Sequence, residues 1–177
     1  MAKVAINGFG RIGRTFFRAA FAHPEIEVVA VNDLGSIENL AYLLTYDSAY
    51  GRSPFEVKVE GKDLIIDGKQ ITFCQEKDPA LLPWGQLGID VVVESTGFFT
   101  TYEGSKKHLQ AGAKKVVISA PVSDDPAAAG VTGATVLMGV NEEKFATCQI
   151  TSNASCTTNA TSPLVAILKE VCGIEKA

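Results

Sequence analysis

A cysteine among small polar residues is the side chain in this sequence best suited to covalent chemistry. Cys156 stands within residues 152–159, and an apolar helical stripe follows over residues 155–171. A thiol in the first turn of a helix lies at the positive end of the helix dipole, which stabilises the nucleophilic thiolate. The hydroxyls of Ser155 and Thr157 flank the thiol and are placed to hold a phosphate at the same helix end. From the residues alone, an inert cysteine beside a Ser/Thr helix cap is an equally good interpretation.

The other three of the four cysteines lack such a setting. Cys172 falls at the opposite end of the same predicted helix, where the dipole has the opposite sign. We interpret Cys172, Cys74 and Cys148 as structural residues. Because the cysteines form neither paired metal-ligand spacings nor a dense disulfide framework, we predict no metal site and a reducing, cytoplasmic environment.

A glycine-rich stretch near the N-terminus is the second chemical feature. Residues 8–13 read Gly-Phe-Gly-Arg-Ile-Gly, the G-x-G-x-x-G pattern of dinucleotide-binding turns, between a strand-like run and a helical pattern. Asp33 closes the next apolar run about 20 residues after the motif, the spacing of the residue that binds the adenosine ribose. A carboxylate there repels a 2′-phosphate, so the sequence favours NAD over NADP.

Each residue of the motif has a physical task. Gly8 permits the sharp turn, Gly10 lets the backbone approach the pyrophosphate, and Gly13 lets the helix pack on the strand. The amides of Arg11 and Ile12 point at the phosphates from a helix N-terminus. The alternative, a structural turn followed by a surface aspartate, does not account for the complete motif in its strand-turn-helix context.

Alternating strands and helices are expected to position these residues. A strand at residues 4–6, a helix at 11–23 and a strand at 26–31 form a β-α-β unit, the module of a parallel sheet. An Asp-Gly turn between alternating stretches predicts an antiparallel excursion over residues 55–73. The other predicted elements are helices at 37–46, 102–112 and 155–171, a helical turn at 79–84, and strands at 90–94, 116–119, 135–138 and 147–151. The sequence thus predicts a Rossmann-type, doubly wound α/β fold with a mostly parallel sheet.

Composition narrows the possible partners. The 177 residues are 46% hydrophobic and carry a net charge of −4, so no basic surface is expected for nucleic acid. No run approaches the roughly 20 apolar residues that span a bilayer, and the N-terminus enters a strand without room for a signal peptide. We therefore expect neither a nucleic-acid nor a membrane partner.

Taken together, the motifs are similar to those of a known family. The chain resembles phosphorylating glyceraldehyde-3-phosphate dehydrogenases along essentially its whole length. Three stretches carry most of the likeness: residues 5–14 (AINGFGRIGR), 94–99 (ESTGFF) and 152–159 (SNASCTTN). Further stretches in the family's order are residues 31–33, 46–48, 118–121 and 138–141.

The resemblance implies a reaction and a set of site residues. Cys156 would attack the aldehyde of glyceraldehyde 3-phosphate, NAD would take the hydride, and inorganic phosphate would release 1,3-bisphosphoglycerate from the thioester. This is a cytoplasmic step of glycolysis and gluconeogenesis, catalysed in this family by a homotetramer. The cofactor residues implied are Arg11, Ile12, Asp33, Lys77 and Ser119, with Ser95, Thr96 and Gly97 along the cofactor's path, and the substrate or phosphate residues are Ser155 and Thr157.

The resemblance also implies that the chain is the N-terminal half of such an enzyme. Residues 1–151 would form the NAD-binding domain, and residues 152–177 would begin a truncated α+β catalytic domain. In this family the histidine that activates the cysteine lies beyond Cys156. His23 and His108 are interpreted instead as surface or helix-end histidines. We therefore expect the chain to bind NAD weakly without turning over the aldehyde.

Two local departures and two alternatives remain open. Ala160 stands where many relatives have a second cysteine, and the loop at residues 121–133 is longer than usual. Erythrose-4-phosphate dehydrogenase shares the cysteine motif, and substrate selection lies mainly outside this stretch of chain. The second alternative is a non-catalytic module that binds NAD or another protein.

Overall fold

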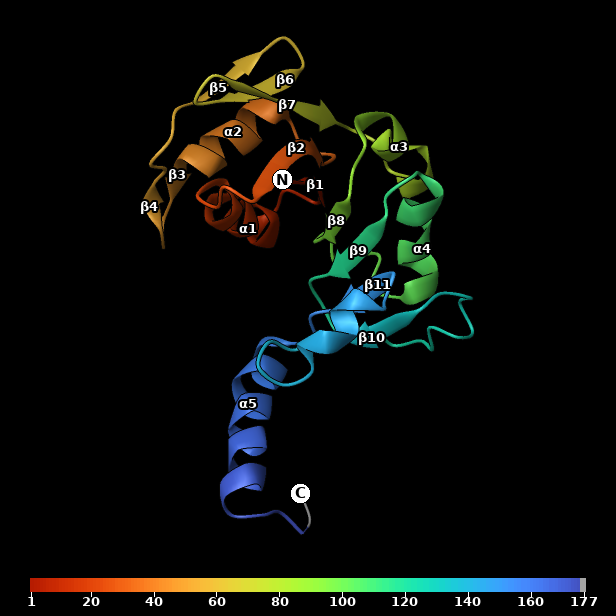
Figure 1. The fold of residues 1–177 in the computed structure, drawn as a ribbon. Coiled ribbons are helices and arrows are strands. Elements are labelled where there is room, and N and C mark those ends of the chain that lie inside the picture. The colour runs from red at the N-terminus through yellow and green to blue at the C-terminus, as the bar shows by residue number, and fades with distance from the viewer. Residues whose placement is uncertain (176–177) are drawn as a thin grey trace.

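The polypeptide begins with the β-α-β unit that the sequence predicts. In the computed structural model, which describes residues 1–175, strands β1 (Ala2–Asn7) and β2 (Ile26–Asn32) pair in parallel. Helix α1 (Arg11–Phe21) connects them (Figure 1). The glycine motif therefore begins directly after β1 and runs into the first turn of α1.

Further strands extend the sheet on both sides of β1. The strand order is β10-β11-β9-β8-β1-β2-β7-β6-β5, and all neighbours from β10 to β7 are parallel. Strands β5, β6 and β7 pair in antiparallel fashion and form the predicted excursion. The additional strands of this sheet are β5 (Val57–Glu60), β6 (Asp63–Ile66), β7 (Lys69–Cys74), β8 (Val91–Glu94), β9 (Lys115–Ile118), β10 (Gly133–Thr135) and β11 (Ile150–Ser152).

A few short elements complete the architecture. Strands β3 (Tyr46–Asp47) and β4 (Gly51–Arg52) form a separate antiparallel pair. The remaining helical elements are α2 (Ile37–Thr45), η1 (Pro79–Leu81), α3 (Trp84–Leu87), α4 (Tyr102–Gln110), η2 (Glu142–Ala146) and α5 (Cys156–Val171).

Helices cover both faces of the sheet because alternate strand residues point in opposite directions. Ala5 and Ala30 belong to a core with residues of α3 and α4. Their neighbours Ile6 and Val31 belong to a second core with residues of α1 and α2. The period of two residues along a strand produces this division. The predicted doubly wound α/β fold is thereby confirmed.

The chain reverses its direction of progress across the sheet at β1. From β1 it proceeds to β2 and β7 on one side, and it then returns to β8 and β9 on the other side. In open parallel sheets, ligands bind outside the carboxyl ends of the strands at such a switch point. The topology therefore directs attention to the ends of β1, β2 and β8.

One predicted strand lies earlier in the chain than expected. The sequence favours residues 135–138, whereas β10 covers Gly133–Thr135. Asn141 Oδ1 accepts a hydrogen bond from Leu137 N (2.8 Å), and Asn141 Nδ2 donates to Thr135 O (3.0 Å). These side-chain bonds compete with the strand ladder and turn the backbone out of the sheet.

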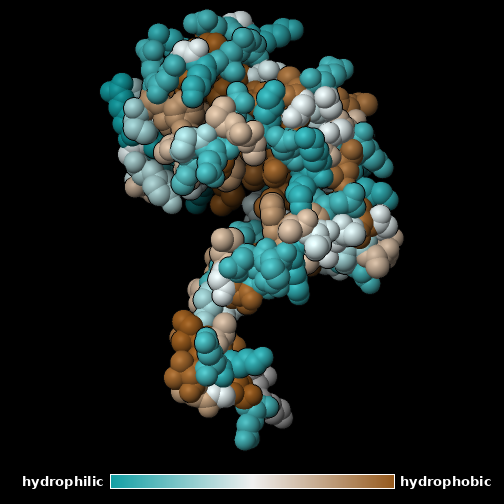
Figure 2. Space-filling view, viewed as in Figure 1, coloured by the Kyte–Doolittle hydropathy of each residue, from teal (hydrophilic) through white to brown (hydrophobic). Residues whose placement is uncertain are grey.

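Helix α5 stands apart from the rest of the molecule (Figure 1). It follows β11 and has no buried residue. Its predicted apolar stripe is exposed at the far end of the molecule (Figure 2), and it consists of Leu164, Val165, Ile167, Leu168 and Val171. Within residues 1–175, no helix has both the length and the apolar character needed to cross a membrane.

A close approach of two glycines at the end of α4 generates a stability prediction. A Cβ on Gly112 (φ +103°) would lie 2.5 Å from the Cα of Gly85, whereas a Cβ on Gly88 (φ +66°) would meet nothing within 4 Å. Gly88→Ala should cost only the left-handed backbone strain of about 1–2 kcal/mol. Gly112→Ala should cost about 2 kcal/mol more, because the backbone of Gly85 must move. Urea unfolding followed by the fluorescence of Trp84 measures both losses, and equal losses would contradict the close approach.

Candidate functional site

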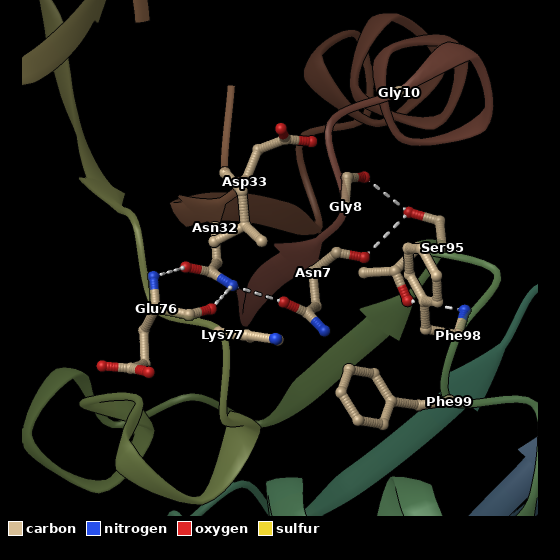
Figure 3. A pocket seen from close by; sticks show the side chains of 12 residues that line it. Asn7, Gly8, Gly10, Asn32, Asp33, Glu76, Lys77, Ser95, Phe98 and Phe99 are labelled. Carbon is tan, nitrogen blue, oxygen red and sulfur yellow. Dashed lines mark hydrogen bonds between the residues drawn. The ribbon is translucent and has the colours of Figure 1, made fainter. Parts of the chain in front are cut away.

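A pocket of about 470 Å³ lies at the carboxyl ends of β1, β2 and β8, where the topology places a ligand (Figure 3). Residues from four successive strand ends meet in it. The lining residues are Asn7, Gly8 and Gly10 after β1, Asn32, Asp33 and Leu34 after β2, Glu76 and Lys77 after β7, and Ser95, Thr96, Phe98 and Phe99 after β8. Six residues predicted for the cofactor are thus brought together: Gly8, Gly10, Asp33, Lys77, Ser95 and Thr96.

The three motif glycines are required for different reasons, as the sequence predicts. A Cβ on Gly8 (φ +91°) would lie 2.6 Å from the backbone nitrogen of Thr96. A Cβ on Gly13 would lie 2.1 Å from the carbonyl oxygen of Gly8, so no larger residue allows α1 to start against the turn. Gly10, in contrast, has no protein atom within 4 Å of its Cβ position. The space above Gly10 is therefore open to the pocket.

The N-terminus of α1 offers free hydrogen-bond donors beside this open space. Its N-cap residue Gly10 makes no side-chain cap, and its first turn holds no acidic residue. Helices α2, α4 and α5 are capped instead by Ser36, Thr101 and Ser155. The first amides of a helix lack intrahelical partners, so α1 presents its positive end uncapped. This is the arrangement that receives a phosphate.

Asp33 joins the end of β2 to the glycine turn. Its Oδ2 accepts a hydrogen bond from Phe9 N (2.6 Å), and its Oδ1 accepts one from Gly35 N (2.8 Å). Each carboxylate oxygen retains a second lone pair, which remains available to a ligand hydroxyl in the pocket. The carboxylate is therefore both fixed in place and able to bind a ribose.

The β8 side of the pocket is anchored to the same turn. Ser95 Oγ donates to Gly8 O (2.7 Å), so this hydroxyl holds the glycine turn (Figure 3). The exposed Lys77 extends its ammonium group into the pocket toward Asn7. Phe98 is 87% exposed and provides an apolar surface beside Ser95.

The other residues predicted for the cofactor lie near the pocket without lining it. Arg11 and Ile12 form the exposed first turn of α1, and Gly13 is buried beneath that turn. Gly97 (φ +78°) lies in the loop after β8. Ser119 follows β9, and its backbone nitrogen donates to Glu94 O (2.9 Å).

The predicted nucleophile occupies the start of α5. Cys156 is the first residue of that helix and is exposed. Ser155 Oγ accepts a hydrogen bond from Thr158 N (3.1 Å) and lies 2.9 Å from Thr157 Oγ1. Ala154 has a positive φ of 55°, a conformation that costs a non-glycine residue about 1–2 kcal/mol. Such backbone strain is typical of functional turns.

The cysteine shares the edge of the sheet with the pocket but does not line it. Helix α5 follows β11, which runs parallel to β9 and therefore ends at the same edge as β9 and β8. Asn153 N donates to Ile118 O (2.8 Å), which fixes the turn before the helix against β9. The pocket and the thiol thus emerge at the same edge of the sheet, with β9 between the strands that precede them.

The remaining cysteines have structural surroundings. Burial raises the pKa of the Cys74 thiol, which disfavours its nucleophilic form at neutral pH. Cys148 is buried, and Cys172 is the exposed C-cap of α5. Within residues 1–175, no group of three or more His, Cys, Asp or Glu side chains is arranged to hold a metal ion.

One interpretation from the sequence is wrong in part. His108, taken as a surface or helix-end histidine, does lie in the last turn of α4, but it is fully buried and not at the surface. Trp84 Nε1 donates to its Nδ1 (3.0 Å), and its Nε2 lies 3.0 Å from Glu94 Oε2. Its spacing from the buried Tyr102 and Ser105 places all three side chains on one helix face, and this periodicity is the signal that could have identified it.

The pocket fits a dinucleotide. Gly10 leaves space where a pyrophosphate must approach, the uncapped start of α1 supplies amide donors, and Asp33 supplies ribose acceptors. These features come from chain segments on both sides of the switch point. They support binding of a dinucleotide across the carboxyl ends of the central strands.

Comparison with known proteins agrees with this geometry. Residues 2–102 match the family model described as "Glyceraldehyde 3-phosphate dehydrogenase, NAD binding domain". The chain is 52% identical over 176 residues to glyceraldehyde-3-phosphate dehydrogenase 1 of Bacillus subtilis (strain 168), covering 98% of this chain and 50% of that protein. It is 52% identical over 174 residues to the glyceraldehyde-3-phosphate dehydrogenase of Geobacillus stearothermophilus, covering 97% and 50%. It is also 51% identical over 178 residues to glyceraldehyde-3-phosphate dehydrogenase 1 of Kluyveromyces lactis, covering 100% and 52%.

The matches define both the cofactor and the extent of the similarity. The chain spans about half the length of the curated relatives it matches. The family model describes an NAD-binding domain, so the cofactor of this pocket is NAD. Cys156 and Ser119 lie beyond the residues that match the family model but within the stretch shared with the full-length relatives.

Because Gly10 faces open space and Gly13 faces Gly8, substitution by alanine should weaken NAD binding at Gly10 and lower the thermal stability at Gly13. Gly10→Ala should leave the melting temperature nearly unchanged and weaken NAD binding by about tenfold or more, because the new methyl group enters the space of the pyrophosphate. Gly13→Ala should lower the melting temperature strongly, because its methyl group meets Gly8 O. Thermal unfolding and calorimetric titration with NAD measure the two effects. A Gly10→Ala variant that binds NAD like the wild type would refute the placement of the pyrophosphate.

Proposed function

Because the chain belongs to the glyceraldehyde-3-phosphate dehydrogenase family, we propose that it is the NAD-binding half of a phosphorylating enzyme acting on glyceraldehyde 3-phosphate. One observation carries the proposal. An NAD pocket and a helix that begins at an exposed cysteine emerge at the same edge of the sheet, from the parallel strands β8 and β11, which are separated only by β9. Oxidation of an aldehyde through a thioester needs these two parts side by side.

The cofactor would be held along the strand ends. The carboxylate of Asp33 would accept hydrogen bonds from the adenosine ribose, and the amides of Arg11 and Ile12 would donate to the pyrophosphate. Further contacts are proposed for Lys77, Ser119, Ser95, Thr96 and Gly97. When bound, NAD supplies the hydride acceptor.

The thiolate of Cys156 would act as the nucleophile. Its sulfur forms a bond to the aldehyde carbon, and the carbonyl oxygen gains the displaced electron pair. Loss of the aldehyde hydrogen as hydride, for which bound NAD would be the acceptor, would re-form the carbonyl group and leave an acyl thioester on Cys156. An oxygen of inorganic phosphate then attacks this carbonyl, and the thiolate leaves, which releases 1,3-bisphosphoglycerate. The hydroxyls of Ser155 and Thr157 are proposed to bind the substrate or the attacking phosphate.

Neither histidine of the chain is placed to assist this chemistry. His108 is buried, and both of its ring nitrogens are engaged. His23 follows the C-terminal end of α1, at the opposite edge of the sheet from Cys156. The general base is therefore expected from a part of the enzyme outside this chain.

The division of the chain follows from this assignment. We propose residues 1–151 as the NAD-binding domain and residues 152–177 as the start of the catalytic domain; residues 176–177 lie outside the described part. The exposed apolar stripe of α5 is expected to pack against the remainder of that catalytic domain. For the complete enzyme we propose a cytoplasmic homotetramer without nucleic-acid or membrane partners.

The two ends of α5 provide a matched test of the nucleophile. Cys156 and Cys172 are both exposed, but they lie at opposite ends of the helix dipole. Iodoacetamide should alkylate Cys156 about fivefold faster, because the start of a helix favours the nucleophilic thiolate and its end does not. Peptide mass spectrometry follows both rates in one sample, with Cys172→Ser and Cys156→Ser as controls. Equal rates would contradict activation of Cys156 within this chain.

Because the general base is expected outside this chain, we expect no NADH formation in a steady-state assay. The 177-residue chain mixed with NAD, glyceraldehyde 3-phosphate and phosphate should form no NADH above the rate of a Cys156→Ser control. Absorbance at the NADH band measures this rate. Sustained NADH formation that disappears in Cys156→Ser would refute the need for a base outside the chain.

A further inference from the structure

A series of hydrogen-bonded side chains lies beneath the NAD pocket. At one end of the series, a backbone donor determines which group donates and which accepts in each bond. The backbone N–H of Glu76 donates to Asn32 Oδ1 (2.8 Å), so the amide nitrogen of Asn32 must face the other way. That nitrogen donates to Asn7 Oδ1 (2.7 Å), as Figure 3 shows. Asn7 Nδ2 in turn donates to Glu94 Oε2 (2.6 Å). The backbone N–H of Glu76, which can only donate, therefore fixes the orientation of the side-chain amides of Asn32 and Asn7, so that the nitrogen of Asn7 faces Glu94.

The opposite end of the series is fixed in the same way. The indole nitrogen of Trp84 is a donor only, and it donates to His108 Nδ1 (3.0 Å). Nδ1 must then be unprotonated, so His108 is the neutral tautomer with its proton on Nε2. This Nε2 donates to Glu94 Oε2 (3.0 Å). Asn7 Nδ2 and His108 Nε2 lie 3.4 Å apart because both converge on that oxygen.

The second oxygen of Glu94 is also surrounded by donors. Oε1 accepts from Thr96 N (2.8 Å) and from Thr96 Oγ1 (2.5 Å), and Thr96 Oγ1 itself accepts from Phe98 N (3.1 Å). Three N–H groups, those of Asn7, His108 and Thr96, thus point at the two oxygens, and this arrangement hydrogen-bonds the carboxylate form of Glu94. It is only 2% exposed, and its partners are neutral amide, hydroxyl and imidazole groups. Glu94 thus carries a buried negative charge, and within residues 1–175 its ion-pair contact is with His108, which is the neutral tautomer.

The topology places this charge under one particular half of the cofactor. Asp33 follows β2, on one side of the switch strand β1, and binds the adenosine half. Glu94 ends β8, on the other side of β1, where the nicotinamide half of a dinucleotide lies in a doubly wound fold. Lys77, the cation that lines the pocket, follows β7 and therefore comes from the adenosine side.

We propose that Glu94 determines the redox specificity of this site and makes it bind NAD⁺ more tightly than NADH. The oxidised nicotinamide ring carries a positive charge, and the reduced ring is neutral. A fixed carboxylate in a low-dielectric environment attracts the charged ring alone. The inference rests on the proposed placement of NAD across β1, and it adds a charge-based preference to that placement. Through the same attraction, Glu94 opposes hydride transfer to the ring and helps reduced cofactor to leave.

The test compares the dissociation constants of NAD⁺ and NADH by calorimetric titration of the 177-residue chain. Glu94→Gln removes the charge, but its amide would face the donors of Asn7 and His108. The double variant Glu94→Gln with Trp84→Phe removes the conflict at His108, because His108 without its indole partner can place its proton on Nδ1 and accept at Nε2; only the conflict with Asn7 then remains. Trp84→Phe alone retains the charge and is the matched control. Asp33→Asn alters the adenosine side and is the control for general weakening.

The expected result is a change in a ratio, which a loss of packing alone would not produce. The ratio of the NADH to the NAD⁺ dissociation constant should exceed one in the wild type and fall about tenfold in the folded neutral variants, the order expected for one unit charge acting on another inside a protein. Trp84→Phe and Asp33→Asn should leave the ratio unchanged. An unchanged ratio in a folded neutral variant overturns the inference while the NAD site stands. A wild type that binds NADH as tightly as NAD⁺ overturns it without any variant, and a wild type that binds neither form overturns the proposed site as well.

Discussion

The contact between Gly13 and the carbonyl oxygen of Gly8 is the constraint on which the site depends. No side chain fits between them, since a Cβ on Gly13 would lie 2.1 Å from that oxygen. The contact brings the first turn of α1 against the end of β1, so its free amides face the space above Gly10. Asp33 and Ser95 then tie the strands on either side to the same turn. The site is therefore assembled around a backbone turn, and its side chains secure that turn.

Beneath the turn, buried polar groups connect strands that are distant in the sequence. Asn7 and Glu94 are separated by 87 residues, yet their side chains are 2.6 Å apart at adjacent strand ends. The network satisfies each polar group it buries and orients the residues that line the pocket. A fully satisfied network of this kind favours a single arrangement, because rotation of one amide would leave its neighbours without partners.

Much of the fold was predictable from the sequence, and the reason is local. The glycine motif, the alternation of apolar residues and the Asp-Gly turn each act within a few residues, and the corresponding elements appear close to their expected bounds. The pocket residues Gly8, Gly10 and Asp33 were predictable because their spacing in a β-α-β unit has a physical cause. The position of Cys156 at the first residue of α5 was predictable for the same reason.

What the sequence did not reveal depends on long-range packing. His108 was misread because its burial is decided by how α4 lies on the sheet and by Trp84, its partner from a different helix. Glu94 and Asn7 gave no local signal, since each is an isolated polar residue at the end of an apolar strand. The side chain of Asn141 makes two hydrogen bonds to the backbone, and these end strand β10 earlier than expected. The spacing of apolar residues in the sequence gives no indication of such bonds. Lys77 was assigned to the cofactor by resemblance alone, and its place in the pocket depends on the loop after β7.

We propose that one edge of the sheet holds both NAD and the reactive thiol. A crystal structure of the chain with bound NAD tests it most directly, through the path of the cofactor from Asp33 toward the start of α5. We expect the pyrophosphate at the first turn of α1 and the nicotinamide beyond β8, on the side of Cys156. A nicotinamide ring found on the opposite side of β1, remote from the sulfur of Cys156, would contradict it.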